Sequence, residues 1–239
     1  MHYVLSDIHG NRQRFDSIME QIALQPEDTL YVLGDVIDRY PDGIRILRQL
    51  MKMPNVKMLL GNHEYMMLDA LYYHRDEPAD DFAAQYQQER RLALWYRNSG
   101  NITHSYLKHL RKTVRAEIFA YLDALPLNIP LTVNGTDYLL VHGGAVCQYE
   151  ERGWQGPSFR DVREFAVWSR YKAYEEGPPG KTVIFGHTPT NHYQDDEALR
   201  IWKGNRLIGI DCGAGWPQGR LACLRLEDGR EFYSKEADT

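Results

Sequence analysis

Cysteine is scarce in this sequence, and its scarcity limits the kinds of site that the chain can form. The 239 residues include only three cysteines, Cys147, Cys212 and Cys223. They are odd in number, far apart and without a CxxC pair, so the sequence indicates neither a disulfide framework nor a thiolate zinc site. We expect reduced thiols in or near the core.

Long apolar runs and an excess of basic residues are also absent. No stretch approaches the roughly 20 apolar residues that span a bilayer, and the segment MHYVLSDIHG lacks the basic flank and long apolar region of a signal peptide. The net charge of -5 provides no general attraction for nucleic acid. We therefore expect a cytoplasmic protein with no membrane or nucleic-acid partner.

The composition is that of an ordinary globular protein, with 43% hydrophobic and 26% charged residues. The length suits one large domain with a sizeable core, or a core domain with an inserted lid. We expect a single domain over residues 1–239. Nothing in the sequence indicates an oligomeric state.

The first sixty residues alternate short β-branched runs with helical patterns. The segments HYVLS, TLYVLGD and NVKMLLGN predict strands. An amphipathic helix follows Asn11, a candidate N-cap, and a second helix is expected over residues 43–51. This βαβαβ order predicts a largely parallel sheet.

The character of the sequence changes between about Tyr65 and Leu125, where Gln, Glu, Arg and aromatic residues dominate. Apolar residues recur there at helical spacing, which predicts a helical insertion: Leu107, Leu110, Val114, Ile118 and Leu122. We expect this insertion to form a wall or lid near the site and to influence substrate choice. From Ile129 onward short strands return, the last two joined by an Asp-Gly turn, and they predict a mixed or antiparallel sheet facing the first.

Polar residues follow five of the predicted strands. The segments are SDIHG (6–10), GDVIDR (34–39), GNHE (61–64), VHGG (141–144) and FGHT (185–188). Each has Asp, Asn or His beside Gly at the end of an apolar run, where open α/β sheets bind ligands. Four of the nine histidines lie at these strand ends: His9, His63, His142 and His187. A functional site is therefore the better interpretation of these segments.

Carboxylates, neutral imidazoles and an Asn carbonyl together suit a pair of divalent metals. Such a mixed oxygen and nitrogen set favours manganese, iron or zinc. Asp7 and His9 are two residues apart, so in extended backbone their side chains leave the same face and can bind one ion. Two metals roughly 3.5 to 4 Å apart can share a carboxylate and direct a water at phosphorus.

Taken together, these segments resemble the motifs of the calcineurin-like metallophosphoesterases, in the phosphoprotein phosphatase branch that includes small bacterial and phage serine/threonine phosphatases. They run in the family's order from residue 6 to residue 188. The resemblance implies an α/β (α+β) fold of two facing mixed sheets flanked by helices, a four-layer α/β/β/α sandwich. It also implies two divalent metal ions, with manganese preferred over iron or zinc.

The resemblance further implies a role for each matching residue. For the metals, it implies that Asp7 and His9 bind the first ion, Asp35 bridges both, and Asn62, His142 and His187 complete the second. His63 would be the general acid, with Asp38 on its other ring nitrogen, and Arg39 would bind phosphate oxygens. Arg170, in VWSR, is the candidate for a second phosphate-binding arginine, although Arg160 and Arg163 are nearby.

Two positions depart from the pattern of the branch. Ser6 and Tyr40 stand where the branch commonly has glycine. The Tyr40 ring has three open interpretations: stacking on a phosphotyrosine, stacking on a base, or packing against the insertion.

The leading functional expectation is a metal-dependent phosphomonoesterase that acts on phosphoserine, phosphothreonine or phosphotyrosine in proteins, without a phosphoenzyme. The alternative is hydrolysis of diadenosine tetraphosphate or related nucleotides, because IDCGAGWPQGRLACLRLEDG resembles the symmetrical dinucleotide hydrolases. Against it, those enzymes typically have Ala at the position of Asp38 and GNHD in place of GNHE. A phosphodiesterase is less favoured because Pro189 replaces a metal-binding histidine, and a non-catalytic scaffold is disfavoured by the full set of site residues.

Overall fold

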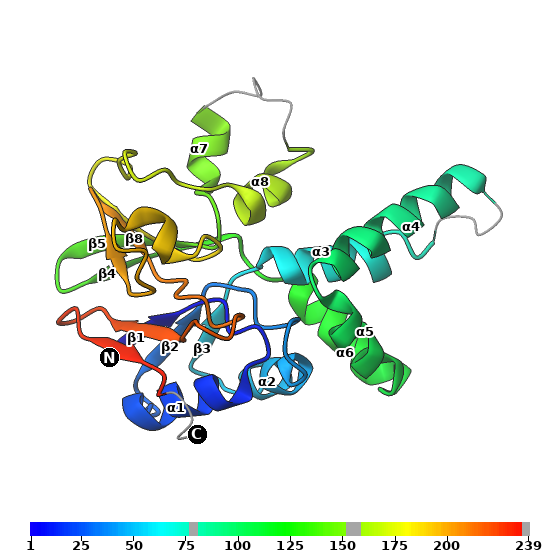
Figure 1. Cartoon of the computed structure of the whole chain (residues 1–239), viewed down its shortest axis with the longest axis horizontal. Coiled ribbons are helices and arrows are strands. Elements are labelled where there is room, and N and C mark those ends of the chain that lie inside the picture. Colours follow the sequence, from blue (N-terminus) through cyan, green and yellow to red (C-terminus); the bar gives the residue numbers. More distant parts are fainter. Residues whose placement is uncertain (77–80, 152–158, 236–239) are drawn as a thin grey trace.

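The first β-sheet is built around the N-terminal βαβαβ segment (Figure 1). The computed structural model describes residues 1–76, 81–151 and 159–235. The parallel strands of this sheet, as predicted, are β1 (His2–Leu5), β2 (Thr29–Val32) and β3 (Val56–Met58). The helices that connect them are α1 (Arg12–Ile22) and α2 (Gly43–Leu50).

Helix α1 begins where its sequence predicts. The side chain of Asn11 accepts a hydrogen bond from the backbone N–H of Arg14 and so satisfies a donor that the first turn leaves free. Phe15, Ile18 and Ile22 are buried on one face, in the same cluster as Leu5 of β1. Each such burial contributes about 1.5 to 3 kcal/mol, so packing against the sheet holds this helix in place.

The C-terminal hairpin belongs to the first sheet, so the prediction that its two strands lie in the second-half sheet is wrong. β9 (Ala222–Arg225) pairs antiparallel with β1, and β10 (Glu231–Tyr233) pairs antiparallel with β9. Because β2 covers only one edge of β1, the backbone groups of the other edge need a partner. The hairpin supplies it and places Leu224 in the core between the sheets.

The second sheet is mixed, as predicted, and its strand order is β4-β5-β6-β8-β7. β4 pairs antiparallel with β5, β5 and β8 flank β6 in parallel, and β7 is an antiparallel edge strand. The bounds of its strands are β4 (Asn128–Val133), β5 (Thr136–Val141), β6 (Thr182–Phe185), β7 (Trp202–Lys203) and β8 (Leu207–Gly209).

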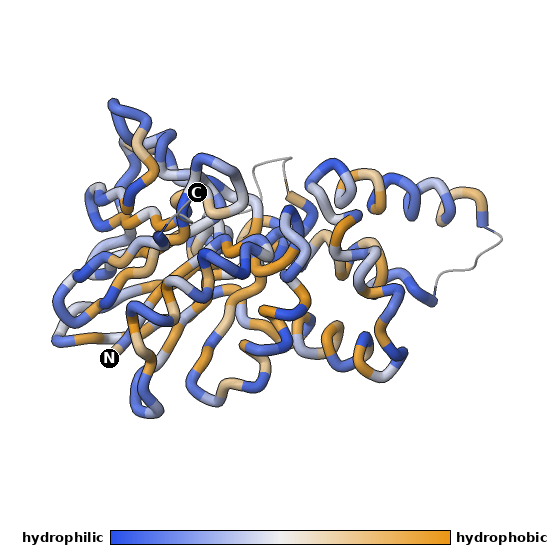
Figure 2. The backbone as a smooth tube through the Cα atoms, turned by 60° about the horizontal axis from the view of Figure 1, so that its bottom comes forward, coloured by the Kyte–Doolittle hydropathy of each residue, from blue (hydrophilic) through white to orange (hydrophobic). Residues whose placement is uncertain are grey.

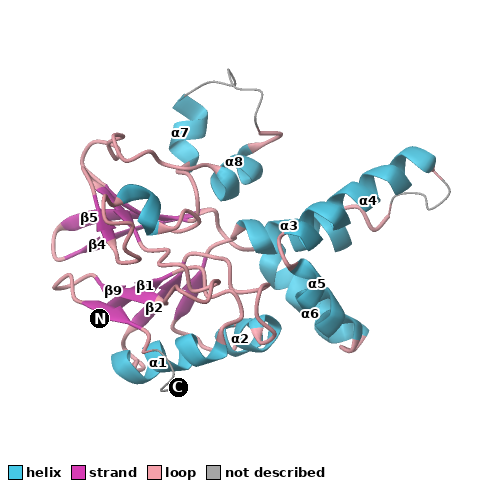
Figure 3. Ribbon diagram, viewed as in Figure 1, coloured by secondary structure: helices cyan, strands magenta, loops and turns pink. Residues whose placement is uncertain are grey.

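The two sheets face each other across a shared apolar core (Figure 3). Val4 and Leu33 from the first sheet's side pack in one cluster with Leu140 and Ile184 from the second. The outer face of the second sheet is covered by α7 (Val146–Glu151) and the 3-10 helix η1 (Thr190–Tyr193), through Cys147 and Tyr193. The expected sandwich of two mixed sheets with flanking helices is thus confirmed.

Helices occupy the region predicted as an insertion, although residues 77–80 of that region lie outside the described part. Their bounds are α3 (Asn62–Leu71), α4 (Phe82–Arg97), α5 (Gly100–Lys108) and α6 (Lys112–Asp123). The first of them begins at Asn62, inside the GNHE motif, so it starts at the candidate site itself. The periodic apolar pattern belongs to two helices, because the chain turns between α5 and α6.

Helix α4 projects from the body of the molecule (Figure 1). Hydrophilic and hydrophobic residues alternate along it in Figure 2, and only Trp95 of its 16 residues is buried. The remaining helix, α8 (Val162–Trp168), packs against α3. Among the described residues, no helix is long and apolar enough to cross a bilayer.

Candidate metal centre

The site is formed by loops that follow the strands, and these loops contain an unusual backbone conformation. Six non-glycine residues there have positive φ: Asp7, His9, Asp35, Asp38, Arg39 and His187, with φ between 49° and 71°. Residues other than glycine rarely adopt positive φ, and the backbone strain of this conformation is found most often at functional sites. The finding corrects one sequence argument, because β1 ends at Leu5 and the side chains of Asp7 and His9 do not converge from extended backbone.

Glu64 holds the loop of Asp35 in this conformation. Its buried carboxylate accepts the backbone N–H groups of Asp35 and Val36, each at 2.8 Å, and that of Ile37 at 3.3 Å. The backbones also approach closely, since a Cβ on Gly34 would lie 2.6 Å from the Cα of Gly61. The GNHE motif therefore shapes the GDVIDR loop.

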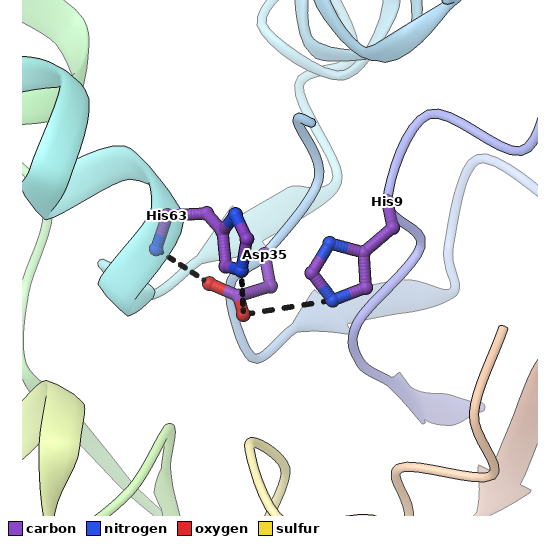
Figure 4. A group of neighbouring side chains, drawn as sticks. All are labelled: His9, Asp35 and His63. Atoms are coloured by element: carbon purple, nitrogen blue, oxygen red, sulfur yellow. Dashed lines mark hydrogen bonds and ion pairs between the residues drawn. The ribbon is translucent and has the colours of Figure 1, made fainter. Parts of the chain in front are cut away.

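Asp35 lies between two groups of candidate ligands. Its Oδ2 is 3.7 Å from His9 Nε2, and its Oδ1 is 3.5 Å from His142 Nε2 (Figure 4 shows the His9 side). One carboxylate oxygen thus faces each group, as a bridging ligand requires.

Asp7 completes the first group. Its Oδ1 lies 3.8 Å from His9 Nε2, while its Oδ2 accepts hydrogen bonds from the Ser6 hydroxyl and from the backbone N–H of His187. Ser6, one of the two departures from the family pattern, therefore orients a candidate metal ligand.

Asn62, His142 and His187 come together as the second group. The Oδ1 of Asn62 lies 3.0 Å from His142 Nε2 and 2.8 Å from His187 Nδ1. Protein ligands lie about 2.0 to 2.2 Å from a transition metal, so neighbouring donors on one ion are roughly 3 Å apart. The spacing of these three atoms fits a shared cation.

The protonation of the imidazoles also suits metal binding. His9 Nδ1 lies 3.1 Å from the Ile37 carbonyl, and His142 Nδ1 lies 2.7 Å from that of Leu33. Each carbonyl places the ring proton on Nδ1 and leaves the lone pair of Nε2 available to a metal ion. Burial lowers the pKa of His9, His142 and His187. Burial, together with the charges of Asp7 and Glu64, raises the pKa of Asp35, although His63 opposes the shift. Neutral imidazoles and crowded carboxylates are a donor set that two divalent cations would stabilise.

His63 lies beside the first group and is bound to Asp38. Its Nδ1 is 2.7 Å from Asp38 Oδ2, whereas its Nε2 lies 3.9 Å from Asp35 Oδ2 (Figure 4). Although burial opposes it, the charges of Asp35 and Asp38 raise the pKa of His63. Distance alone would allow His63 as a further ligand, but its carboxylate partner and raised pKa suit a proton donor.

Arg39 is placed to bind an anion. Its guanidinium lies 3.8 Å above the ring of Trp216, and its buried Nη1 has no hydrogen-bond partner within residues 1–76, 81–151 and 159–235. A Cβ on Gly215 would contact both Arg39 and His9, so the guanidinium is next to the first ligand group. An unpartnered buried donor at this position fits a phosphate oxygen.

Of the three candidate arginines before the last motif, Arg170 is the one beside a candidate metal ligand. It donates to the backbone carbonyl of His187 at 3.0 Å and to the Thr188 hydroxyl at 2.9 Å. Arg160 contacts Tyr65 and Asp69, and Arg163 contacts Asp123. Those two arginines tie α8 and the segment before it to the insertion.

A cavity of about 770 Å³ opens next to Arg170. Its lining includes Thr188, Tyr193 and Trp216, whose exposed fraction is 42%. A second cavity, of about 620 Å³, is lined by Tyr40 and Arg14.

Several residues of the site have no predicted role in the sequence. They are Glu64, which lies within the GNHE motif, and Trp95, Asp211 and Trp216. Asp211 is buried, and burial and the Asp7 charge raise its pKa, although Gly213, Arg39 and Arg170 oppose the shift. Its place in the apolar run RLIGIDCG was the available signal, because that strand also ends in an acid beside a glycine turn.

Residues 3–213 match the model of the calcineurin-like phosphoesterase family. The chain belongs to this family. The resemblance indicated by the five motifs is thus confirmed. Membership of this family implies divalent metal ions, and the ligand groups around Asp35 are where this chain would hold them.

Curated relatives that this chain resembles share one name, symmetrical bis(5'-nucleosyl)-tetraphosphatase. A symmetrical bis(5'-nucleosyl)-tetraphosphatase from Acidovorax sp. (strain JS42) is 30% identical over 149 residues, which is 62% of this chain but only 45% of the relative. The chain thus matches less than half of that relative's length.

Two solved structures share the fold at lower identity. One is a candidate diadenosine tetraphosphatase, with a TM-score of 0.59, 18% identity and coverage of 100% of this chain and 94% of that one. The other is a protein serine/threonine phosphatase from Saccharomyces cerevisiae, with a TM-score of 0.55, 15% identity and coverage of 100% and 80%. At these identities the likeness concerns the fold alone.

Proposed function

We propose that this phosphoesterase hydrolyses a dinucleoside polyphosphate of the diadenosine tetraphosphate class. The observation that carries the proposal is the cavity of about 770 Å³ between Arg170 and Trp216. Its volume is in the range of small-ligand sites, and it adjoins both arginines, since Arg170 lines it and Trp216 stacks on Arg39. The name of the Acidovorax relative supports the same substrate class.

In this proposal the phosphates lie at the ligand groups and one nucleoside lies in the cavity. Arg39 and Arg170 would bind non-bridging oxygens and stabilise the charge that grows in the transition state. The half-exposed indole of Trp216 offers a face on which a base can stack. Two divalent metals, of which manganese is our first choice, would supply an activated water and charge neutralisation. Asp7, His9, Asp35, Asn62, His142 and His187 would hold them.

A second candidate function is hydrolysis of phosphoserine, phosphothreonine or phosphotyrosine in proteins. The observation that favours it is the buried pair of Asp38 and His63, 2.7 Å apart. A serine or threonine alkoxide is a much poorer leaving group than a nucleotide, so it gains far more from a general acid. The same site would serve both reactions.

The test is a direct comparison of kcat/KM on diadenosine tetraphosphate, a phosphoserine peptide and a phosphotyrosine peptide, with Mn²⁺ supplied. We expect the dinucleotide to be preferred at least about tenfold, a difference of about 1.4 kcal/mol in transition-state stabilisation. A preference for either peptide would overturn the proposal and establish the second candidate. The Asp35→Asn variant, purified identically, controls for contaminating phosphatase. If the unchanged protein supplied with Mn²⁺ shows neither bound metal nor turnover, it is a non-catalytic scaffold.

A further inference from the structure

The helical insertion reaches the candidate site through one buried side chain. Trp95 has no exposed surface, although it lies on α4, whose other residues are all at least partly exposed. Its indole Nε1 donates a hydrogen bond to Asp38 Oδ2 at 2.9 Å. That oxygen is the same atom that His63 Nδ1 contacts at 2.7 Å.

Trp95 and His63 share one oxygen of the Asp38 carboxylate. Asp38 is fully buried, and its other oxygen, Oδ1, has no hydrogen-bond partner in the part of the chain that the structure describes. The carboxylate is therefore anchored at one oxygen, by two donors from different elements. An indole N–H can donate a hydrogen bond but cannot accept one. Trp95 therefore cannot accept the proton that His63 Nδ1 donates to Asp38.

The main chain of Asp38 is also held by the insertion. Its backbone N–H donates to the Thr103 hydroxyl, on α5, at 3.1 Å. Asp38 has a φ of 71°, a conformation that a non-glycine residue keeps only when its surroundings impose it. The insertion thus constrains both the backbone and the carboxylate of this residue.

The indole itself has little freedom to turn. The ring of His104 stacks on it with centroids 5.6 Å apart and an interplanar angle of 28°. On another side is Gly100, where any Cβ would overlap the indole ring. The direction of the N–H is therefore set by packing between α4 and α5.

We propose that Trp95 is a positioning residue for the reaction: its indole N–H orients the Asp38 carboxylate and so aims His63 at the leaving oxygen. The insertion then positions the general acid His63 through Asp38, in addition to any contact that it makes with substrate. This inference rests on the proposed function only in assuming phosphoester hydrolysis with His63 as proton donor. It does not depend on whether the substrate is a dinucleotide or a phosphoprotein.

The experiment compares Trp95→Phe with the unchanged protein, both loaded with Mn²⁺, on a series of phosphate monoesters. The phenyl ring retains most of the packing but removes the N–H. For an alkyl ester such as phosphoserine we expect kcat to fall about 10- to 100-fold, the value of a hydrogen bond to a charged group, with KM unchanged. For p-nitrophenyl phosphate, whose leaving group needs little protonation, we expect a loss below about threefold. An equal loss on both esters, or no loss, would overturn the proposal.

A double-mutant cycle with His63→Asn separates positioning from general damage. If Trp95 acts through His63, adding Trp95→Phe to His63→Asn causes no further loss of kcat on the alkyl ester. Additive losses would show that Trp95 acts elsewhere. If His63→Asn alone lowers kcat equally on the alkyl ester and on p-nitrophenyl phosphate, the general-acid role fails and this inference fails with it. The comparison of dinucleotide and peptide substrates above is unaffected by that outcome.

Two controls address folding. Trp202→Phe changes a tryptophan that stacks on Tyr193 at the opposite sheet, and it should leave the leaving-group dependence unchanged. In the unmutated, ¹⁵N-labelled protein, the Trp95 indole N–H should be protected from exchange, and Asp38→Asn should move its resonance. If the Trp95 indole proton exchanges freely with solvent and its chemical shift is unchanged by Asp38→Asn, the hydrogen bond itself is contradicted. This measurement holds even if Trp95→Phe does not fold.

Discussion

The carboxylate of Glu64 accepts the backbone N–H of Asp35 at 2.8 Å, so an acid outside both candidate ligand groups holds the residue that faces them. Glu64 is fully buried, and burial raises its pKa although the N–H groups of Asp35 and Val36 and the charge of His63 oppose the rise. The loop and the first turn of α3 therefore behave as one unit.

Replacement of Glu64 should destabilise the protein. Glu64→Ala leaves the backbone N–H groups of residues 35–37 without their acceptor, at about 1 to 3 kcal/mol for each buried donor. We expect the free energy of unfolding to fall by about 3 kcal/mol or more, measured by urea denaturation of the metal-free protein. Glu64→Gln keeps one carbonyl oxygen as an acceptor and should lose less. Equal stability of the Ala variant and the unchanged protein would mean that water replaces the carboxylate.

Asp35→Asn should remove both metals together. Each oxygen of Asp35 faces a different ligand group, and an amide offers only one oxygen and no charge. Metal content by inductively coupled plasma mass spectrometry should fall from two ions per chain toward zero. As the matched variant, His9→Asn changes the first group alone and should spare the ion of the second. Retention of both ions by Asp35→Asn would show that it does not bridge.

His63→Asn should retain both metals and lose turnover. The assignment of His63 as a proton donor predicts a fall in kcat of about two to four orders of magnitude on an alkyl ester, because a general acid contributes about that much. Metal content and steady-state rates, measured on the same sample, test this. Because His63 Nε2 lies only 3.9 Å from Asp35, loss of an ion in this variant would instead make His63 a ligand.

The three cysteines should differ in reactivity. Burial raises the pKa of Cys212 to about 12 and that of Cys223 further, so neither forms the reactive thiolate near neutral pH, whereas Cys147 is partly exposed. We expect a thiol reagent such as DTNB to modify one cysteine in the folded protein at pH 8 and all three in denaturant. Cys147→Ser should abolish the reaction of the folded protein. Rapid modification of that variant would place Cys212 or Cys223 at the surface.

Much of the fold and of the site follows from local sequence. The parallel order of β1 to β3 comes from short β-branched runs that alternate with an amphipathic helical pattern, and Asn11 caps α1 through a contact three residues away. The ligand candidates were visible because each follows a strand within a few residues. Parallel strands bring their carboxyl ends to the same edge of a sheet, so position along the chain predicts that Asp7, Asp35 and Asn62 meet at the first sheet. The same argument places His142 and His187 together at the second sheet, and the facing of the two sheets joins the two sets.

Other features depend on partners that are far apart in the sequence. The hairpin of β9 and β10 has alternating strands of its own, but only the free edge of β1, some 220 residues away in register Tyr3 to Arg225, decides which sheet it joins. Glu64 could be recognised as part of a motif, yet its task depends on three backbone N–H groups of another loop. The positive φ angles of Asp7 and His9 likewise arise from the packing of loops and not from residue type.

By itself, the sequence determined the chemistry: which carboxylates, imidazoles and arginines are available, and their place after the strands. Tertiary structure decided how those groups are held, because a hydrogen bond such as that of Trp95 to Asp38 joins residues 57 positions apart and has no local signature. A tryptophan in an otherwise exposed helix is indistinguishable in sequence from a surface aromatic. Only the packing of α4 and α5 against the Asp38 loop buries it and directs its N–H at the candidate general-acid pair.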